Sequence, residues 1–132
     1  MNSPAADIKD ILIESSTGLS LVFSTDLFVS KMPEDVDECV CIYDGPGPSP
    51  EANYELFYPT VQVRVRGNKM AYVTTYALVK DVRDVLHGMT NKIINGTRYL
   101  EITCSGDIMF IAYDESERPI FSVNFDIHRT TA

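Results

Sequence analysis

The sequence is poor in the residues that metal sites and catalytic centres use. It has only two histidines, His87 and His128, and they lie in different segments. A zinc site needs more Cys or His at ligand spacing, and no G-x-S-x-G or comparable nucleophile motif is present. His87 falls in the last turn of an expected helix, where an imidazole suits the dipole. His128 falls on the polar face of an expected strand. The sequence therefore predicts no enzyme, no metal site and no cofactor.

Cysteines are also few. There are three, Cys39, Cys41 and Cys104, and an odd number excludes complete pairing within the chain. On a strand, residues two apart have Cα atoms about 7 Å from each other, which suits a disulfide poorly. We therefore expect three reduced, largely packed thiols.

Basic residues are scarce. The chain has 11 Lys and Arg against 19 Asp and Glu, a formal net charge of −8. Affinity for DNA comes mostly from neutralising phosphates with cations, so this balance argues against a general nucleic-acid-binding protein. Taken alone, the acidity indicates a soluble protein.

Long apolar runs are missing as well. The uninterrupted apolar stretches are only a few residues long, whereas a membrane helix needs about 20. The first ten residues include Asp7 and Asp10 and carry no basic leader, so they do not resemble a signal peptide. We expect no membrane partner and a protein that stays in, or is assembled in, the cytosol.

Two helices are expected in a single domain over residues 1–132, a length typical of one domain. Ser3 and Pro4 open a helix over residues 4–15 as cap and first helical residue. A longer amphipathic helix over 69–87 presents an apolar stripe and ends at Gly88.

The remaining pattern predicts strands. We expect strands at 39–43 and 59–67, separated by a Pro/Gly-rich loop over 44–58, and three antiparallel strands within 98–129. The apolar patches 21–23 and 27–29 predict one further strand or turn, without deciding which, and no role follows for residues 16–38. The resulting fold class is α+β, a mainly antiparallel four- to five-stranded sheet with two helices packed on one face.

Several stretches in this order resemble a known family. They are YDGPGPSP at 43–50, YPTVQVRVRG at 58–67 and RDVLHG at 83–88, followed by the C-terminal strands. Together they resemble the phage minor capsid protein family, which overlaps in fold with tail-terminator and tail-completion proteins of the neck. The resemblance covers about residues 39–129.

The resemblance implies a structural virion protein of a long-tailed bacteriophage, assembled in the host cytoplasm. Such a protein forms a hexameric ring at the head-proximal end of the tail tube, ends tail growth and joins tail to head. Its partners are further copies of itself, the tail tube protein and a head–tail connector or stopper protein. Genome DNA passes through without specific binding, and the family has no catalytic residues. A head-completion or stopper protein of the connector is one alternative, and an unrelated α+β binding module with a concave apolar pocket is another.

Candidate contact residues lie on one strand and in the loop. Arg64 and Arg66 occupy the polar side of the strand at 59–67, where they either face solvent or meet acids of the next subunit. Aromatic residues are unusually frequent beside the Pro/Gly segment and either form a docking arm or fold back on the core. The loop residues in question are Pro46, Pro48, Tyr54, Phe57 and Tyr58.

The resemblance also suggests a second interpretation of the acidity. A negatively charged lumen repels phosphate and lets DNA slide. The candidate lumen acids are Glu101, Asp114, Glu115 and Glu117.

Overall fold

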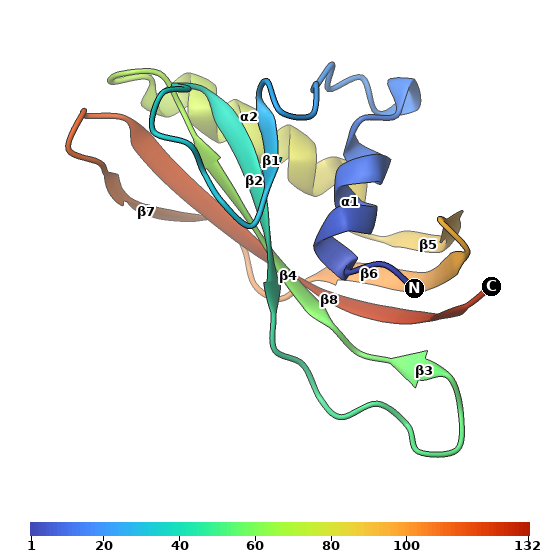
Figure 1. The fold of residues 1–132 in the computed structure, drawn as a ribbon. Helices are drawn as coiled ribbons and strands as arrows, with labels where there is room; N and C mark the ends of the chain where they lie inside the picture. Colours follow the sequence, from blue (N-terminus) through green and yellow to red (C-terminus); the bar gives the residue numbers. More distant parts are fainter.

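One long strand organises the sheet. In the computed structural model, which describes residues 1–132, β8 (Pro119–Thr131) runs through the middle of the molecule (Figure 1). One edge of β8 pairs with β3 (Leu56–Phe57) and β4 (Thr60–Arg66), which lie end to end along it. The other edge pairs in the same way with β6 (Thr97–Cys104) and β7 (Met109–Tyr113). Both sides of β8 are thereby hydrogen-bonded along much of its length.

Three more strands complete a mixed, curled sheet of eight strands. β2 (Cys39–Gly45) pairs antiparallel with β4, β1 (Leu27–Val29) pairs parallel with β2, and β5 (Met89–Ile94) pairs antiparallel with β6. The strand order is β1-β2-β4-β8-β6-β5. The expected mainly antiparallel sheet of four to five strands is therefore wrong in its strand number, and the parallel pair β1–β2 makes the sheet mixed. β1 and β3 are too short to show a period-two pattern, and the polar residues of β5 hide its alternation.

The three C-terminal strands are antiparallel to their partners, as expected, but they do not pair in succession. β6 and β7 follow each other along the same edge of β8, rather than pairing with one another. Residues 105–108 interrupt the ladder between them, and β5 covers β6 but not β7. β7 consequently has one paired edge and one free edge.

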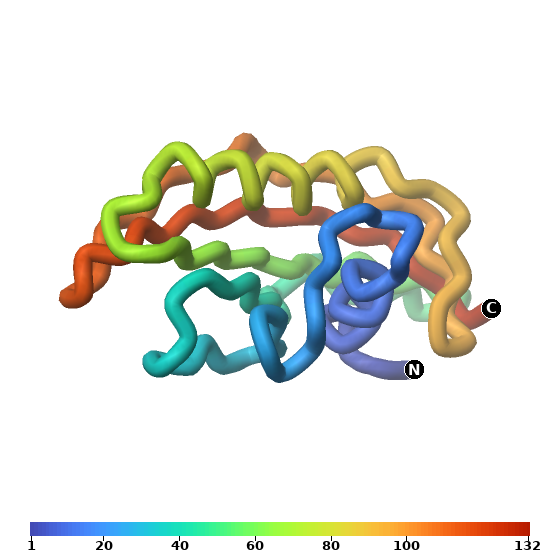
Figure 2. Tube along the Cα trace, turned by 90° about the horizontal axis from the view of Figure 1, so that it is seen from above, coloured from blue at the N-terminus to red at the C-terminus, as the bar shows by residue number.

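Two helices pack on one face of the sheet, which confirms the α+β class (Figure 2). α1 (Pro4–Leu12) ends three residues before the expected boundary, and a 3₁₀ turn, η1 (Ser15–Thr17), follows it. α2 (Tyr72–Leu86) begins after a turn in which Met70 has φ 59°, so the expected start at residue 69 is too early. A left-handed backbone at Met70 cannot belong to a right-handed helix.

The core lies between the helices and the sheet. Period-two alternation directs Val61, Val63 and Val65 of β4 toward the helices. Alternate apolar residues of β8 point toward the helices as well. Ile8 and Ile11 of α1 and the apolar stripe of α2 close this core from above. Each fully buried aliphatic side chain contributes about 1.5–3 kcal/mol, so these positions fix which face of the sheet is covered.

A buried polar network fastens α1 to the far end of β8. The carboxylate of Asp7 has no solvent exposure and accepts hydrogen bonds from the Tyr99 hydroxyl at 2.5 Å and from Asn95 Nδ2 at 2.9 Å. Arg129 donates to the Tyr99 hydroxyl at 3.2 Å and lies 3.7 Å from the Asp7 carboxylate. Burial, followed by the hydrogen bond to Asp7, raises the pKa of Tyr99. The phenol therefore stays protonated and acts as the donor.

Candidate assembly surfaces

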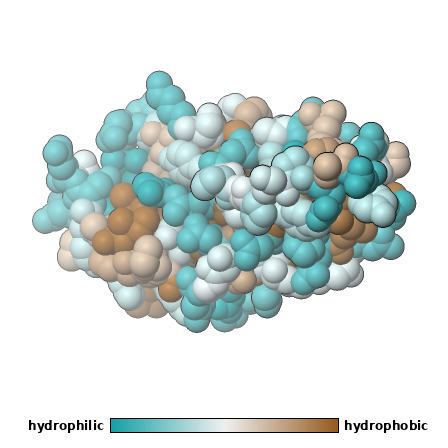
Figure 3. Space-filling view, turned by 90° about the horizontal axis from the view of Figure 1, so that it is seen from below, coloured by the Kyte–Doolittle hydropathy of each residue, from teal (hydrophilic) through white to brown (hydrophobic).

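The face of the sheet opposite the helices is open and mainly hydrophilic (Figure 3). The outward positions of β4 and β8 carry Gln62, Arg64, Asn124 and Asp126 on this face, because the inward positions hold the core. Arg64 is half-buried; its Nε donates to Gln62 Oε1 at 2.9 Å and its guanidinium lies 5.6 Å from the Tyr43 ring centroid. Arg64 has no ion pair within the chain.

Arg66 is a buried residue with a structural role, and it is only 3% exposed. The guanidinium donates to the carbonyl of Asp37 at 3.4 Å and to the carbonyls of Pro33 and Val36. These bonds hold the connection between β1 and β2 against the end of the sheet. Arg66 therefore has a structural role that nearby Arg64 does not share.

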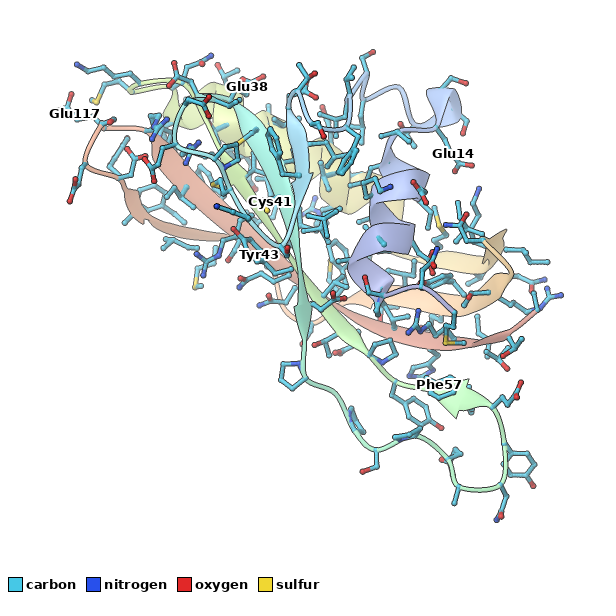
Figure 4. All side chains as sticks on the ribbon, viewed as in Figure 1. Glu14, Glu38, Cys41, Tyr43, Phe57 and Glu117 are labelled. Atoms are coloured by element: carbon cyan, nitrogen blue, oxygen red, sulfur yellow. The ribbon has the colours of Figure 1, made fainter.

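Arg118 joins two acidic segments that are distant in sequence. Its side chain is 4% exposed and forms ion pairs with Glu34 and Asp37 at 3.2 Å and with Asp114 at 2.8 Å. The segment 34–38 and the turn 114–118 therefore lie together at one end of the molecule, where Figure 4 labels Glu38 and Glu117. Sequence reasoning missed this site because a lone arginine in a turn gives no indication of its partners.

The candidate lumen acids fall into two groups. Burial alone would raise the pKa of Asp114, but hydrogen bonds from the Arg118 backbone N–H and guanidinium lower it below its usual value. Glu117 lies 3.3 Å from Lys69 with both side chains exposed, and Glu115 is exposed. Glu101 faces His128 across the β6–β8 ladder, nine residues along β8 from the end of the turn, or about 30 Å.

The Pro/Gly-rich loop leaves the body after β2 and returns through β3 (Figures 1 and 4). At its base the Thr60 hydroxyl donates to the Pro46 carbonyl at 2.6 Å. The Tyr58 hydroxyl donates to Glu51 at 3.0 Å, and its ring meets His128 edge-on with centroids 5.1 Å apart.

The aromatic residues of this loop therefore differ in exposure. Phe57, within β3, and Tyr58 are half-buried, and Pro48 lies with Tyr58 beside a small hollow. Tyr54, in contrast, is 73% exposed near the tip of the loop. The base of the loop is held on the body, and its tip presents one free aromatic ring.

An apolar surface at β7 escaped sequence reasoning. All five residues of β7 are exposed and none is charged. Beside them, exposed Tyr72 and Tyr76 of α2 and Phe110 of β7 surround the buried Phe121 ring, with centroids 5.1–5.7 Å from it. The strand itself is visible in the sequence, but its exposure depends on the absence of a neighbouring strand.

The structure shows few features of other site classes. No group of three or more His, Cys, Asp or Glu side chains is placed to hold a metal ion, and no helix is both long and apolar enough to cross a membrane. Burial raises the pKa of Cys39 and of Cys41, and all three thiols are free. A hollow of about 410 Å³ on the open sheet face has only three hydrophobic residues among eleven, so it does not match the apolar pocket of a binding module.

Comparison with known proteins finds one matching family and a solved structure with a similar fold. The family model described as bacteriophage tail terminator protein matches residues 17–131. Among solved structures, a chain from the virion of a native gene transfer agent particle superposes with a TM-score of 0.70. The match covers 97% of this chain and 95% of that chain at 12% identity, a likeness of fold. No curated protein matches the chain by sequence.

Proposed function

This chain belongs to the bacteriophage tail terminator family, and from that premise we propose that it is a structural protein of the virion neck. It forms a ring, a homo-hexamer, on the head-proximal end of the tail tube of a long-tailed phage. The ring ends tube growth and joins the tail to the head without catalysis. The observation that carries the proposal is the family match over 17–131, which spans every strand and α2.

The proposed partners follow from this position. The ring contacts the tail tube protein on one side and a connector or stopper protein on the other, after assembly in the host cytoplasm. The fold supports such a role, because a subunit with free sheet edges can hide them against its neighbours in a closed ring.

Two sequence-predicted positions remain suited to those contacts. Tyr54 projects an exposed ring from the loop, and aromatic side chains are favoured at interface centres. Arg64 lies on the open face without an acidic partner in its own chain, so it is available to an acid of another subunit. Arg66 supports the fold, and we leave it out of the proposed contacts.

The charge of the subunit suits passage of DNA. The net charge is −8, and seven of the eleven cations take part in ion pairs within the chain, which leaves few to bind phosphate. We propose that Glu101, exposed on the open sheet face, and Glu115 and Glu117 of the acidic end contribute to a lumen that repels DNA. Asp114 is engaged by Arg118 and contributes mainly to the turn.

Electron microscopy of the purified protein mixed with polymerising tail tube subunits tests this function. We expect rings that cap tubes of limited length. Tubes that continue to grow uncapped, while the protein binds a connector, would reassign it to the stopper position. A protein that binds neither tube nor connector would contradict the neck assignment. Tyr54→Ala is expected to give fewer capped and longer tubes, with an unchanged unfolding midpoint.

A further inference from the structure

We propose that the apolar surface at β7 binds a second copy of this chain as a subunit contact of the ring. This β7 surface consists of Tyr72, Tyr76, Met109, Phe110, Ile111 and Tyr113. The proposal rests on the ring function proposed above and deepens it, because none of these residues is among the contacts that the sequence suggested.

The free edge of β7 lacks the protection that the other edges have. Exposed strand edges are normally blunted by shortness, charge or a cover. β1 has three residues and β3 two, and β5 carries Lys92. β7 has five residues without a charge, and Met109 and Ile111 are 56% and 39% exposed. An unprotected edge of this kind in a folded protein indicates a partner.

The edge continues into an aromatic cluster on α2. The Phe110 ring lies 5.3 Å from Tyr72 and 5.4 Å from Tyr113, and the four exposed rings of the surface are 37–43% accessible. At 150–250 Å² per aromatic side chain, these rings alone expose roughly 300 Å². That is more than a third of the approximately 800 Å² that each partner buries in a standard interface.

The surrounding sheet adds to this surface. Met109 pairs with Ser122 on the open side of the sheet, and Figure 3 shows hydrophobic side chains gathered at this end of the face, in the region of β7. The β7 surface thus continues around the edge, from α2 to the open face. Contiguous apolar patches of several hundred Å² on soluble proteins mark interaction sites.

A second copy fits this surface because a ring joins two different surfaces of the same subunit. The opposite edge of the sheet, at β1, also carries exposed apolar side chains: Val22 is 56% and Phe23 46% exposed. Figure 2 shows β1 and β7 on opposite sides of the molecule.

Lys31, an exposed cation without an ion pair in the chain, follows β1. The acids that flank β7, Asp107 and Asp114, are paired with Arg83 and Arg118 of their own chain, so the match between the two edges rests on their apolar side chains. Head-to-tail packing of the β7 edge on the β1 edge of the next copy would cover both in every subunit.

Site-specific photo-crosslinking in assembled rings tests the proposal. A benzophenone amino acid is placed at position 111 in one variant and at position 93 in another, since Ile93 is equally an exposed edge-strand isoleucine, at 51%. In rings on tail tubes, we expect position 111 to give a product of twice the 14.8 kDa chain mass, and position 93 to give none. A product with the tube protein from position 111, or no product in well-formed rings, would overturn the proposal.

A matched pair of substitutions provides the second readout. Ile111→Lys is expected to lower the fraction of capped tubes at least tenfold, while Ile93→Lys caps like the wild type, both with wild-type unfolding midpoints. Equal capping by both variants would refute the β7 contact and leave the terminator function standing. Failure of the wild type to cap would instead refute the terminator function. If Ile111→Lys does not fold, the crosslinking result decides.

Discussion

At the scale of single residues, a carboxylate near one end of the chain fixes a contact with the other end. Asp7 lies in the first turn of α1, where its charge suits the helix dipole, and this much is visible in the sequence. The structure adds that Asp7 is fully buried with Tyr99, Asn95 and Arg129 around it. A buried charge needs such partners, because desolvation without them is costly.

Removing the phenol tests this network. Tyr99→Phe keeps the ring but leaves the buried carboxylate without its closest donor. We expect the free energy of unfolding, measured by urea denaturation, to fall by about 1–3 kcal/mol. Tyr58→Phe is the control, because it removes a hydroxyl that binds Glu51 at the surface, and it should change the value by less than about 0.5 kcal/mol. Equal losses in the two variants would show that the Asp7 network adds nothing specific.

At the scale of elements, the junction of β4 and α2 depends on close backbone approach. Gly67 follows β4, and a Cβ atom at this position would collide with the Thr75 hydroxyl of α2. Thr75 cannot easily move, since its hydroxyl is buried and donates to the Ala71 carbonyl at 2.5 Å. The glycine therefore sets how closely the helix crosses the end of the strand.

Gly67→Ala is accordingly expected to destabilise the protein. Overpacking of this kind costs about 1–3 kcal/mol, seen as a lower thermal unfolding midpoint and a lower urea midpoint. Asn68→Ala is the neighbouring control, because Asn68 is exposed, and it should stay within about 0.5 kcal/mol of the wild type. A wild-type midpoint for Gly67→Ala would mean that α2 shifts freely on the sheet.

At the scale of the whole molecule, charge is distributed unevenly. Most cations are neutralised inside the chain, and acids from two distant segments gather around Arg118 at one end. The net charge of −8 therefore comes mainly from unpaired carboxylates at the surface. Such a surface favours solubility and disfavours contact with phosphate.

This charge predicts an absence of DNA binding. At physiological salt, we expect the fluorescence anisotropy of labelled duplex DNA to stay constant as protein is added to concentrations above about 10⁻⁴ M. This concentration is the upper end of the ordinary range of non-specific dissociation constants. The same titration at low salt is the control, because basic patches bind more tightly there. Salt-dependent micromolar binding would argue that the subunit grips DNA and would contradict a repelling lumen.

The sequence by itself determined the elements with strong local patterns. The alternating valines of β4 and the apolar stripe of α2 could be read directly, because periodicity follows from backbone geometry. The α+β class followed from the order of these elements, and the family resemblance followed from the succession of particular sequence stretches between residues 39 and 129. Local patterns left β1 undecided between strand and turn. They failed for β3, which is too short to show a period, and for β5, whose polar residues mask it.

Only the tertiary structure decided which residues share an environment. Arg64 and Arg66 are equivalent in the alternation of β4, yet one lies on the open face and the other is enclosed by the β1–β2 connection. β7 has the apolar composition of a core strand, yet it is exposed, because β5 stops beside β6 and leaves the β7 edge free. Burial and pairing depend on segments far away in the chain, so periodicity can assign a residue to a face of its strand but cannot tell what covers that face.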